Sequence, residues 1–156
     1  MFEQDEFWMR KAIETATAAG NLNEVPVGAC LIDNQRELLA IAGNRTITTS
    51  DPTAHAEILV LREAAALIGN YRLTETVLYT TIEPCTMCAG ALVNARIKRL
   101  VFGAHDERFG AVESVYQICN TSSLNHKIEI TSGVLAEDCR RLMQEFFKGK
   151  RRKAKG

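Results

Sequence analysis

The chain has 156 residues, a length typical of one domain, and its 46% hydrophobic content is enough to build one core. Charged residues make up 24% and no low-complexity run is present, which argues against a largely disordered chain. No apolar run is long enough to cross a bilayer and the N-terminus is acidic, so we expect neither a membrane span nor a signal peptide. Five cysteines without such a signal favour a reducing cytoplasm over a disulfide framework.

The charges are distributed unevenly along the chain. Nineteen basic and nineteen acidic residues cancel, but six of the basic ones follow Phe147. Residues 1–147 therefore carry a formal charge of −6, and we expect them to form one domain with a basic tail at residues 148–156. Such a tail predicts a local contact with a polyanion, for which we favour nucleic acid. A solvated tail without a partner is the alternative.

Apolar periodicity and turn residues predict helices and strands that alternate along the chain. The first helix has an apolar stripe from Trp8 to Ala19, and the last has a stripe of Leu135, Cys139, Leu142 and Phe146. Between them we expect helices at residues 55–68, 84–95 and 113–118. We expect strands at residues 25–32, 38–42, 77–81, 99–102 and 127–130, the first two forming a hairpin.

This order of elements predicts an α/β fold with a mixed sheet between layers of helices. The last three strands should be parallel, because helices connect them. Ligands of such sheets bind beyond the carboxyl ends of the strands. The strand at residues 77–81 leads directly into Glu83-Pro84-Cys85, so we expect a site at that corner.

Two short motifs supply the ligands for a metal ion. His55-Ala56-Glu57 offers an imidazole and a carboxylate, and Pro84-Cys85-Thr86-Met87-Cys88 offers two thiols in CxxC spacing. Catalytic zinc sites use three protein ligands and a water, so we predict that His55, Cys85 and Cys88 bind Zn²⁺. Two thiolates leave the metal centre formally neutral, which makes a nearby base necessary, and Glu57 is the candidate.

His55 and Glu57 are two residues apart and would point to nearly opposite sides of a regular helix. They can converge only near a helix start, which Asp51-Pro52-Thr53 predicts, with Asp51 or Thr53 as N-cap and Pro52 in the first turn. Pro84 similarly predicts the first turn of a second helix. We therefore expect both ligand-bearing segments at helix N-termini that face each other across one metal.

Other interpretations exist for each motif alone. A CxxC pair is also typical of redox sites and zinc knuckles. A structural zinc site would need a fourth ligand, for which Cys30, Cys119, Cys139, His105 and His126 are available. The combination of HxE, a strand and PCxxC is the signature of zinc nucleobase deaminases, and we favour that interpretation.

Longer segments resemble one family. They are VPVGA (residues 25–29), DPTAHAEI (51–58), LYTTIEPCTMCAGAL (78–92), ARIKRLVFGAHD (95–106) and NHKIEITSGVL (125–135). Together they are similar to the bacterial tRNA-specific adenosine deaminases of the cytidine-deaminase-like superfamily. The resemblance implies a three-layer α/β/α sandwich with a mixed five-stranded sheet. It also implies a homodimer with one zinc per subunit, which deaminates the wobble adenosine (position 34) of a tRNA anticodon to inosine.

The resemblance assigns roles to individual residues. The zinc ligands carry over to His55, Cys85 and Cys88, and the proton shuttle carries over to Glu57. A nucleoside-contacting asparagine matches Asn44, although an asparagine after a glycine is more often a turn residue. We also expect contacts to the substrate from Asp106, Asn125, His126 and Phe147. The chain departs from the family pattern at His105, at residues 107–109 and at residues 121–124.

The sequence leaves two further functions open. The zinc ligands alone do not distinguish a tRNA deaminase from one that acts on a free nucleobase or nucleoside of the guanine or cytosine type. Outside enzymology, a closed zinc site would fit a structural-zinc RNA-binding module.

Overall fold

The computed structural model describes residues 2–155, so Gly156 of the predicted tail lies outside the described residues. The elements in chain order are α1 (Phe2–Asn21), β1 (Gly28–Ile32), β2 (Leu38–Gly43), α2 (Ala56–Ile68), β3 (Val77–Ile82), α3 (Thr86–Asn94), β4 (Arg99–Ala104), β5 (Glu129–Ser132) and α4 (Ala136–Lys155). All five predicted strands are present, each with bounds shifted by a few residues.

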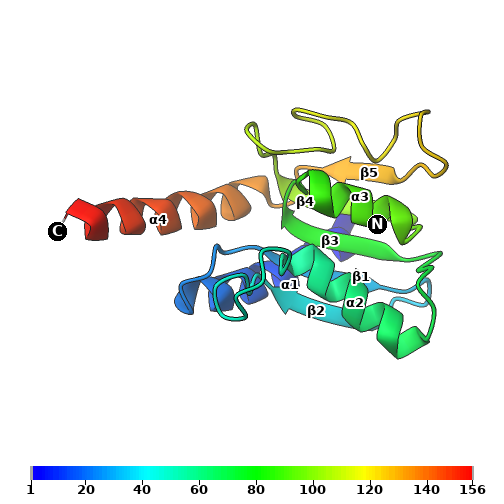
Figure 1. Cartoon of the computed structure of the whole chain (residues 1–156), viewed down its shortest axis with the longest axis horizontal. Coiled ribbons are helices and arrows are strands. Elements are labelled where there is room, and N and C mark those ends of the chain that lie inside the picture. Colours follow the sequence, from blue (N-terminus) through cyan, green and yellow to red (C-terminus); the bar gives the residue numbers. More distant parts are fainter. Residues whose placement is uncertain (1, 156) are drawn as a thin grey trace.

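The five strands form one mixed sheet in the order β2-β1-β3-β4-β5 (Figure 1). β1 pairs antiparallel with both β2 and β3, while β3, β4 and β5 run parallel to one another. The predicted hairpin and the three parallel strands are thus confirmed. β3 lies at the centre of the sheet, so the site that follows its carboxyl end lies at the middle of one sheet edge.

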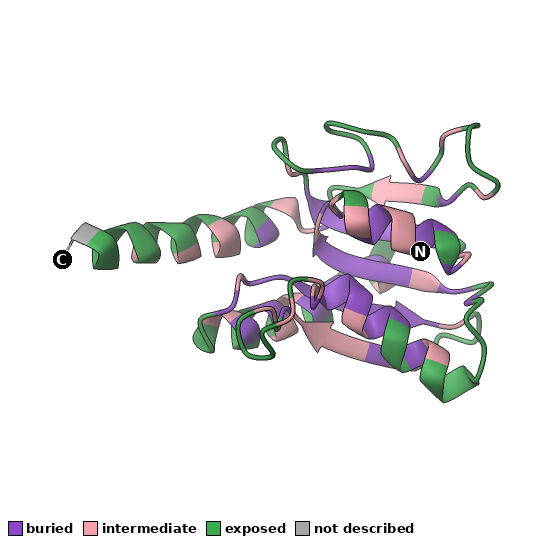
Figure 2. Ribbon diagram, viewed as in Figure 1, coloured by how far each residue is buried: buried purple, intermediate pink, exposed green. Residues whose placement is uncertain are grey.

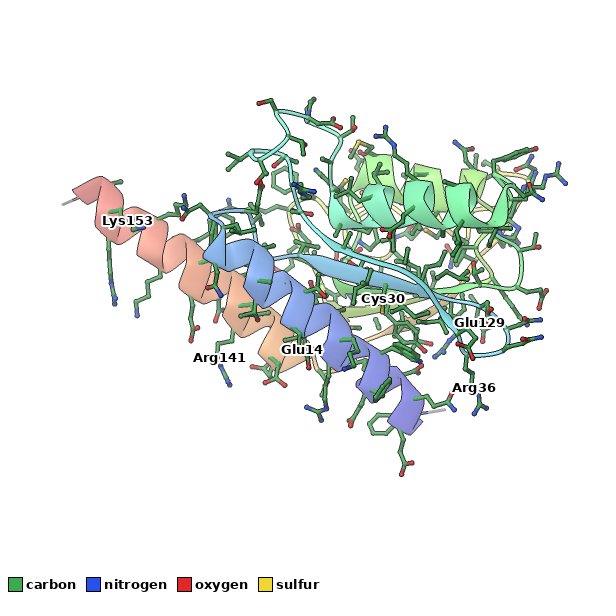
Figure 3. The ribbon with its side chains drawn as sticks, turned by 90° about the horizontal axis from the view of Figure 1, so that it is seen from below. Glu14, Cys30, Arg36, Glu129, Arg141 and Lys153 are labelled. Atoms are coloured by element: carbon green, nitrogen blue, oxygen red, sulfur yellow. The ribbon has the colours of Figure 1, made fainter. Side chains whose placement is uncertain are left out.

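Helices cover both faces of the sheet, as Figure 3 shows. The larger core cluster packs α2 and α3 against the sheet and includes Val60, Leu78, Leu92 and Phe102. A smaller cluster on the other face includes Met9, Tyr79, Val101 and Cys139 and lies under α1 and α4. β1 and β4 are buried along their whole length (Figure 2). The predicted three-layer α/β/α arrangement is confirmed.

The helix predicted at residues 113–118 is wrong. Residues 111–114 form a single turn, and residues 116–118 have no regular structure. The chain leaves the helical path after this turn, because the N–H of Ile118 bonds the carbonyl of Ala111 seven residues earlier, while the carboxylate of Glu83 accepts hydrogen bonds from the N–H groups of residues 112–114 and ties the turn to the end of β3. Local propensity therefore yields to a tertiary contact here.

The helix starts also differ in detail from the prediction. The N-cap of α2 is His55, not Asp51 or Thr53, and Pro52 precedes the helix. Asp51 instead accepts hydrogen bonds from the N–H and hydroxyl of Thr53, which closes a turn before the helix. Pro84 likewise precedes its helix, because Cys85 is the N-cap of α3.

The last helix continues through the predicted basic tail. α4 runs from Ala136 to Lys155, and its C-terminal half projects beyond the sheet (Figure 1). Most of this half is exposed (Figure 2). The basic residues are therefore presented on a helix. Among residues 2–155, no helix combines the length and apolarity that crossing a membrane requires.

The packing of α1 on β1 depends on the missing side chain of Gly28. A Cβ atom there would lie 2.0 Å from the carbonyl oxygen of Ala12, which is backbone and cannot rotate away. We expect Gly28→Ala to lower the free energy of unfolding by about 2 kcal/mol or more, because α1 must shift. Urea denaturation of the purified variant measures this loss.

Gly90→Ala in α3 is the matched control. A Cβ at Gly90 meets no atom within 4 Å, so the same substitution should be neutral or stabilise by about 0.5–1 kcal/mol. Equal stability of the Gly28 and Gly90 variants would contradict the tight α1–β1 contact.

Candidate metal centre

Two helix N-termini bring the three predicted metal ligands together. His55 is the N-cap of α2 and has extended backbone angles (φ −74°, ψ 149°), so its side chain leaves the helical path that Glu57 follows. Cys85 is the N-cap of α3, with Cys88 in the first turn. The predicted meeting of two helix starts is confirmed, because the ligand atoms of His55, Cys85 and Cys88 all lie within 4.8 Å of one another.

The spacing of these atoms fits a tetrahedral zinc ion. The Nδ1 atom of His55 lies 3.6 Å from the Sγ atom of Cys85 and 3.4 Å from that of Cys88. A tetrahedral ion with ordinary Zn–S and Zn–N bonds separates its sulfur and nitrogen ligands by about 3.6 Å. One imidazole and two thiolates are also a donor set that zinc prefers. Nδ1 is therefore the atom that His55 presents to a metal ion at this corner.

The electrostatics of the corner favour a thiolate. A hydrogen bond from the Cys88 thiol, followed by one from His55, lowers the pKa of Cys85 to about 4, although burial opposes the shift. The N-terminal position on α3 acts in the same direction, since unpaired amides and the helix dipole stabilise negative charge. Cys88 donates the shared hydrogen bond, and this contact and burial raise its pKa. The negative charge of the Cys85 thiolate therefore favours binding of a cation at this corner.

The number of converging ligands is that of a catalytic zinc site. Within the described chain, the side chains that converge are His55, Cys85 and Cys88. The other candidate ligands are engaged elsewhere: Cys30 and Cys139 are buried under α1 and α4, and His126 bonds the carbonyl of Ile97. His105 pairs with Glu113 on the surface. Three ligands leave one tetrahedral position for water or substrate.

Glu57 lies in the first turn of α2 beside this group. Its side chain is only 3% exposed, and burial raises its pKa to about 7. A carboxyl group with a pKa near neutrality can both accept and donate a proton at working pH. A bound dication would favour the ionised form. The position and the pKa suit a general acid–base.

The metal ligands open into a cavity of about 1220 Å³. His55, Glu57 and Cys85 line its floor, together with Asn44 from the end of β2. The Oδ1 atom of Asn44 accepts a hydrogen bond from the N–H of Ala56 (2.7 Å), so this residue caps α2. Its amide NH2 group remains as a donor toward a ligand.

The structure brings only some of the expected substrate-contacting residues to the cavity. Asp106 and Phe147 line it, as Asn44 does. Asn125 and His126 lie elsewhere: the His126 ring bonds the carbonyl of Ile97, which precedes β4, and the carbonyl of Asn125 accepts a hydrogen bond from Arg96. Both are therefore near the amino end of β4, whereas the metal ligands lie at the carboxyl ends of the strands.

Sequence reasoning missed several residues of the cavity wall. They are Thr46, Arg108, Phe109, Val115 and Tyr116, and Lys150 and Arg151 line the same wall. The loop composition gives no signal for most of them, since each becomes a wall residue only through the folding of its loop. Lys150 and Arg151 belong to the predicted tail, so its charge already indicated them.

Two buried carboxylates, Glu83 in the cavity lining and Glu24 beside it, were also missed as functional groups. Burial raises the pKa of Glu24, but hydrogen bonds from Thr48, Ile47 and Thr46 lower it by more. The pKa of Glu83 is also lowered, because hydrogen bonds from residues 106–114 lower it by more than burial raises it. Both side chains are thus held as carboxylates inside the protein.

Comparison with known proteins places this arrangement in context. The family described as the cytidine and deoxycytidylate deaminase zinc-binding region matches residues 2–104. A tRNA-specific adenosine deaminase of Haemophilus influenzae is 50% identical over 153 residues, which cover 98% of this chain and 88% of that protein. One from Bacillus subtilis is 42% identical over 152 residues, covering 97% of this chain and 94% of that protein.

Solved structures share the fold. One from a study of A-to-I editing by tRNA:A34 deaminases at the wobble position of transfer RNA gives a TM-score of 0.84 at 41% identity. The aligned region covers 87% of this chain and 98% of the chain in that structure. A guanine deaminase from Nitrosomonas europaea gives a TM-score of 0.78 at 25% identity, covering 90% of this chain and 83% of that chain.

Removing one sulfur ligand should empty the metal centre. We expect Cys88→Ala to reduce bound zinc from one ion per chain to less than about 0.1 ion per chain. The two remaining ligands bind zinc too weakly to retain it during dialysis. Metal analysis of the purified protein after dialysis measures the zinc content.

Cys30→Ala, which removes a buried thiol on the other face of the sheet, should keep a full complement of zinc. A Cys88→Ala protein that retains one tightly bound zinc would contradict the proposed ligand set.

Proposed function

The chain belongs to the cytidine and deoxycytidylate deaminase zinc-binding family, and we propose that it hydrolytically deaminates adenosine to inosine at wobble position 34 of a tRNA anticodon. The observation that carries this proposal is the convergence of His55, Cys85 and Cys88 beside the buried Glu57 in one cavity. The relatives with 50% and 42% identity over nearly the whole chain support adenosine in tRNA as the substrate.

The chain's own residues account for the chemistry of the reaction. His55, Cys85 and Cys88 would hold zinc, which would lower the pKa of a water molecule and so supply the nucleophile. Glu57 accepts a proton from the attacking oxygen and delivers it to N1 of the adenine as the C6–O bond forms. Glu57 then transfers the second proton to the amino group, the C6–N bond breaks and ammonia leaves. One carboxylate thus shuttles two protons, which requires it to lie beside the metal without binding it.

The size of the cavity supports a polymeric substrate. At about 1220 Å³ it exceeds the range of about 300–1,000 Å³ that is common for small-molecule sites. Exposed aromatic side chains at its wall, Phe109, Tyr116 and Phe147, offer stacking surfaces for unstacked bases. Lys150 and Arg151 from the projecting half of α4 add positive charge to the same wall. This combination suits an RNA loop whose target base is extruded.

A homodimer and a cytoplasmic location complete the proposal. The family resemblance supports two subunits with one zinc each, and a tRNA substrate supports the cytoplasm. The alternative with support of its own is a free-base deaminase, because a guanine deaminase shares the fold at 25% identity. The higher identity to tRNA-specific enzymes favours RNA.

Incubation of the zinc-loaded protein with an anticodon stem-loop that carries adenosine at position 34 tests the function directly. We expect inosine at position 34, detected by nuclease digestion and mass spectrometry. Free guanine, cytosine and adenine serve as parallel substrates. Deamination of a free base without reaction of the stem-loop would reject the tRNA proposal in favour of the alternative.

Replacing the proton shuttle should separate metal binding from turnover. We expect Glu57→Gln to keep one zinc per chain but to lower kcat by a factor of about 10² or more, since an amide cannot carry the two protons. Stem-loop deamination together with metal analysis measures both effects. Near-normal turnover of zinc-replete Glu57→Gln would exclude the assigned role.

The basic residues of α4 should make RNA binding depend on salt. We expect the double variant Lys150→Gln, Arg151→Gln to reduce the slope of log KM against log salt concentration by about 0.7–0.9 for each lost phosphate contact. Turnover of the stem-loop at several salt concentrations gives this slope. The control variant Arg10→Gln, Lys11→Gln on α1 removes two exposed charges away from the cavity and should leave the slope unchanged.

A further inference from the structure

Two buried carboxylates take no part in the proton transfers, yet each reaches a loop that lines the cavity. Glu24 is fully buried and Glu83 is 2% exposed. We propose that Glu24 and Glu83 are positioning residues, which hold the 44–54 loop and the 105–116 loop in the conformation that admits an extruded RNA nucleotide. This inference rests on the proposed function.

Glu24 holds the loop between β2 and α2. Its carboxylate accepts hydrogen bonds from the N–H groups of Ile47 (3.2 Å) and Thr48 (2.7 Å) and from the hydroxyls of Thr46 (3.4 Å) and Thr48 (2.6 Å). Residues 46–50 form one isolated turn, and these N–H groups lie at its start, where a carboxylate is favourable. Thr46 lines the cavity, so this contact fixes part of the wall.

Glu83 holds the loop that follows β4 by the same device. Its carboxylate accepts hydrogen bonds from the N–H groups of residues 106 and 112–114, at 2.7–3.1 Å, and from the hydroxyl of Ser114. A Cβ atom at Gly110 would lie 2.3 Å from the carboxyl carbon, so the loop wraps closely around this group. The wrapped loop carries Asp106, Phe109 and Tyr116 into the cavity wall.

The two loops lie at the same end of the sheet, the end from which α4 projects (Figure 1). Glu24 directly precedes Val25, which lines the cavity, and Glu83 directly precedes Pro84-Cys85 at the metal centre. Each carboxylate therefore connects a loop of the wall to a part of the chain that already lies at the cavity or the metal.

Backbone hydrogen bonds close the ends of the 44–54 loop, among them the N–H of Arg45 to the carbonyl of Ala54, but its middle buries little apolar surface. Ile47 is 65% exposed, and Thr48, Thr49 and Ser50 are exposed as well, so apolar burial contributes little to its order. Among the hydrogen bonds of the described residues, those of the N–H groups of Ile47 and Thr48 go to Glu24. The 105–116 loop has apolar anchors in Ala111 and Val112, which are buried, and Glu83 adds four backbone contacts to them.

Loop order has a defined kinetic consequence. If only a fraction of the molecules holds both loops in the competent conformation, the apparent affinity for RNA falls by that fraction. Bound RNA selects the competent conformation, so turnover at saturation changes little. A residue that acts through the loops therefore changes KM, whereas a residue that only stabilises the fold changes the melting temperature without changing the KM of the folded protein.

Single hydroxyl donors allow a mild test that keeps the carboxylates in place. Thr48→Val removes one hydrogen bond to Glu24, and Ser114→Ala removes one to Glu83. Neither side chain lines the cavity, so neither variant changes the cavity surface itself. We expect each variant to raise KM for the anticodon stem-loop about threefold to tenfold, the effect of one hydrogen bond, with kcat within about twofold and one zinc per chain.

Matched controls remove the same groups elsewhere. Thr17→Val deletes a hydroxyl that bonds the Ile13 carbonyl on α1, and Ser132→Ala deletes an exposed hydroxyl on β5. Both should leave KM unchanged. Glu24→Gln and Glu83→Gln should raise KM further than the hydroxyl variants, provided that their circular dichroism and zinc content match the parent protein.

The outcomes separate the inference from the function on which it rests. Unchanged KM in Thr48→Val and Ser114→Ala would overturn the positioning role, as would a fall in kcat or zinc content with KM unaltered. If the parent protein deaminates a free base and not the stem-loop, the proposed function fails. Thr48→Val and Ser114→Ala are then tested on that free base. An unchanged KM for the base would overturn the positioning role as well.

Discussion

The chemistry of this protein depends on one geometric constraint, the meeting of two helix N-termini at the carboxyl end of the central strand. β3 leads directly into the corner that carries Cys85 and Cys88, and the start of α2 brings His55 against them. The N-cap position gives His55 and Cys85 extended backbone, so their side chains can turn toward each other while the following residues enter their helices. The amide groups at the start of α3 also favour the negative charge of the Cys85 thiolate.

Buried carboxyl groups occupy two different environments around this centre. Burial raises the pKa of Glu57 to about 7, which suits a group that must take up and release protons. Glu24 and Glu83 are equally buried, but hydrogen bonds from turn amides hold them ionised, which suits a group that must stay fixed. The balance between burial and hydrogen-bond donors therefore sets the pKa of each carboxyl group. Glu57 titrates near neutral pH, whereas Glu24 and Glu83 stay ionised. A glutamate side chain thus lies at the metal centre in one environment and behind the cavity wall in the other.

The regular elements and the metal ligands were predictable, because both depend on local sequence. Apolar stretches bounded by turn residues identified the five strands, and HxE with PCxxC identified His55, Glu57, Cys85 and Cys88. The helix at residues 113–118 was predicted wrongly, since Glu83 from a distant strand end fixes a single turn there and the chain then folds back, with the N–H of Ile118 on the carbonyl of Ala111. The helix caps were misplaced for a similar reason: Asn44, twelve residues away, satisfies the first amide of α2 and leaves Asp51 to close a turn.

The sequence by itself determined the layered α/β architecture, the identity of the zinc ligands and the basic charge at the C-terminus, because periodicity, ligand spacing and charge are properties of neighbouring residues. The tertiary structure alone decided which loop residues form the cavity wall and that Glu24 and Glu83 reach those loops. It also decided that Asn125 and His126 lie at the amino end of β4, away from the cavity. These contacts join segments 22 to 31 residues apart, and no local pattern encodes a hydrogen bond between a carboxylate and the backbone of a distant loop.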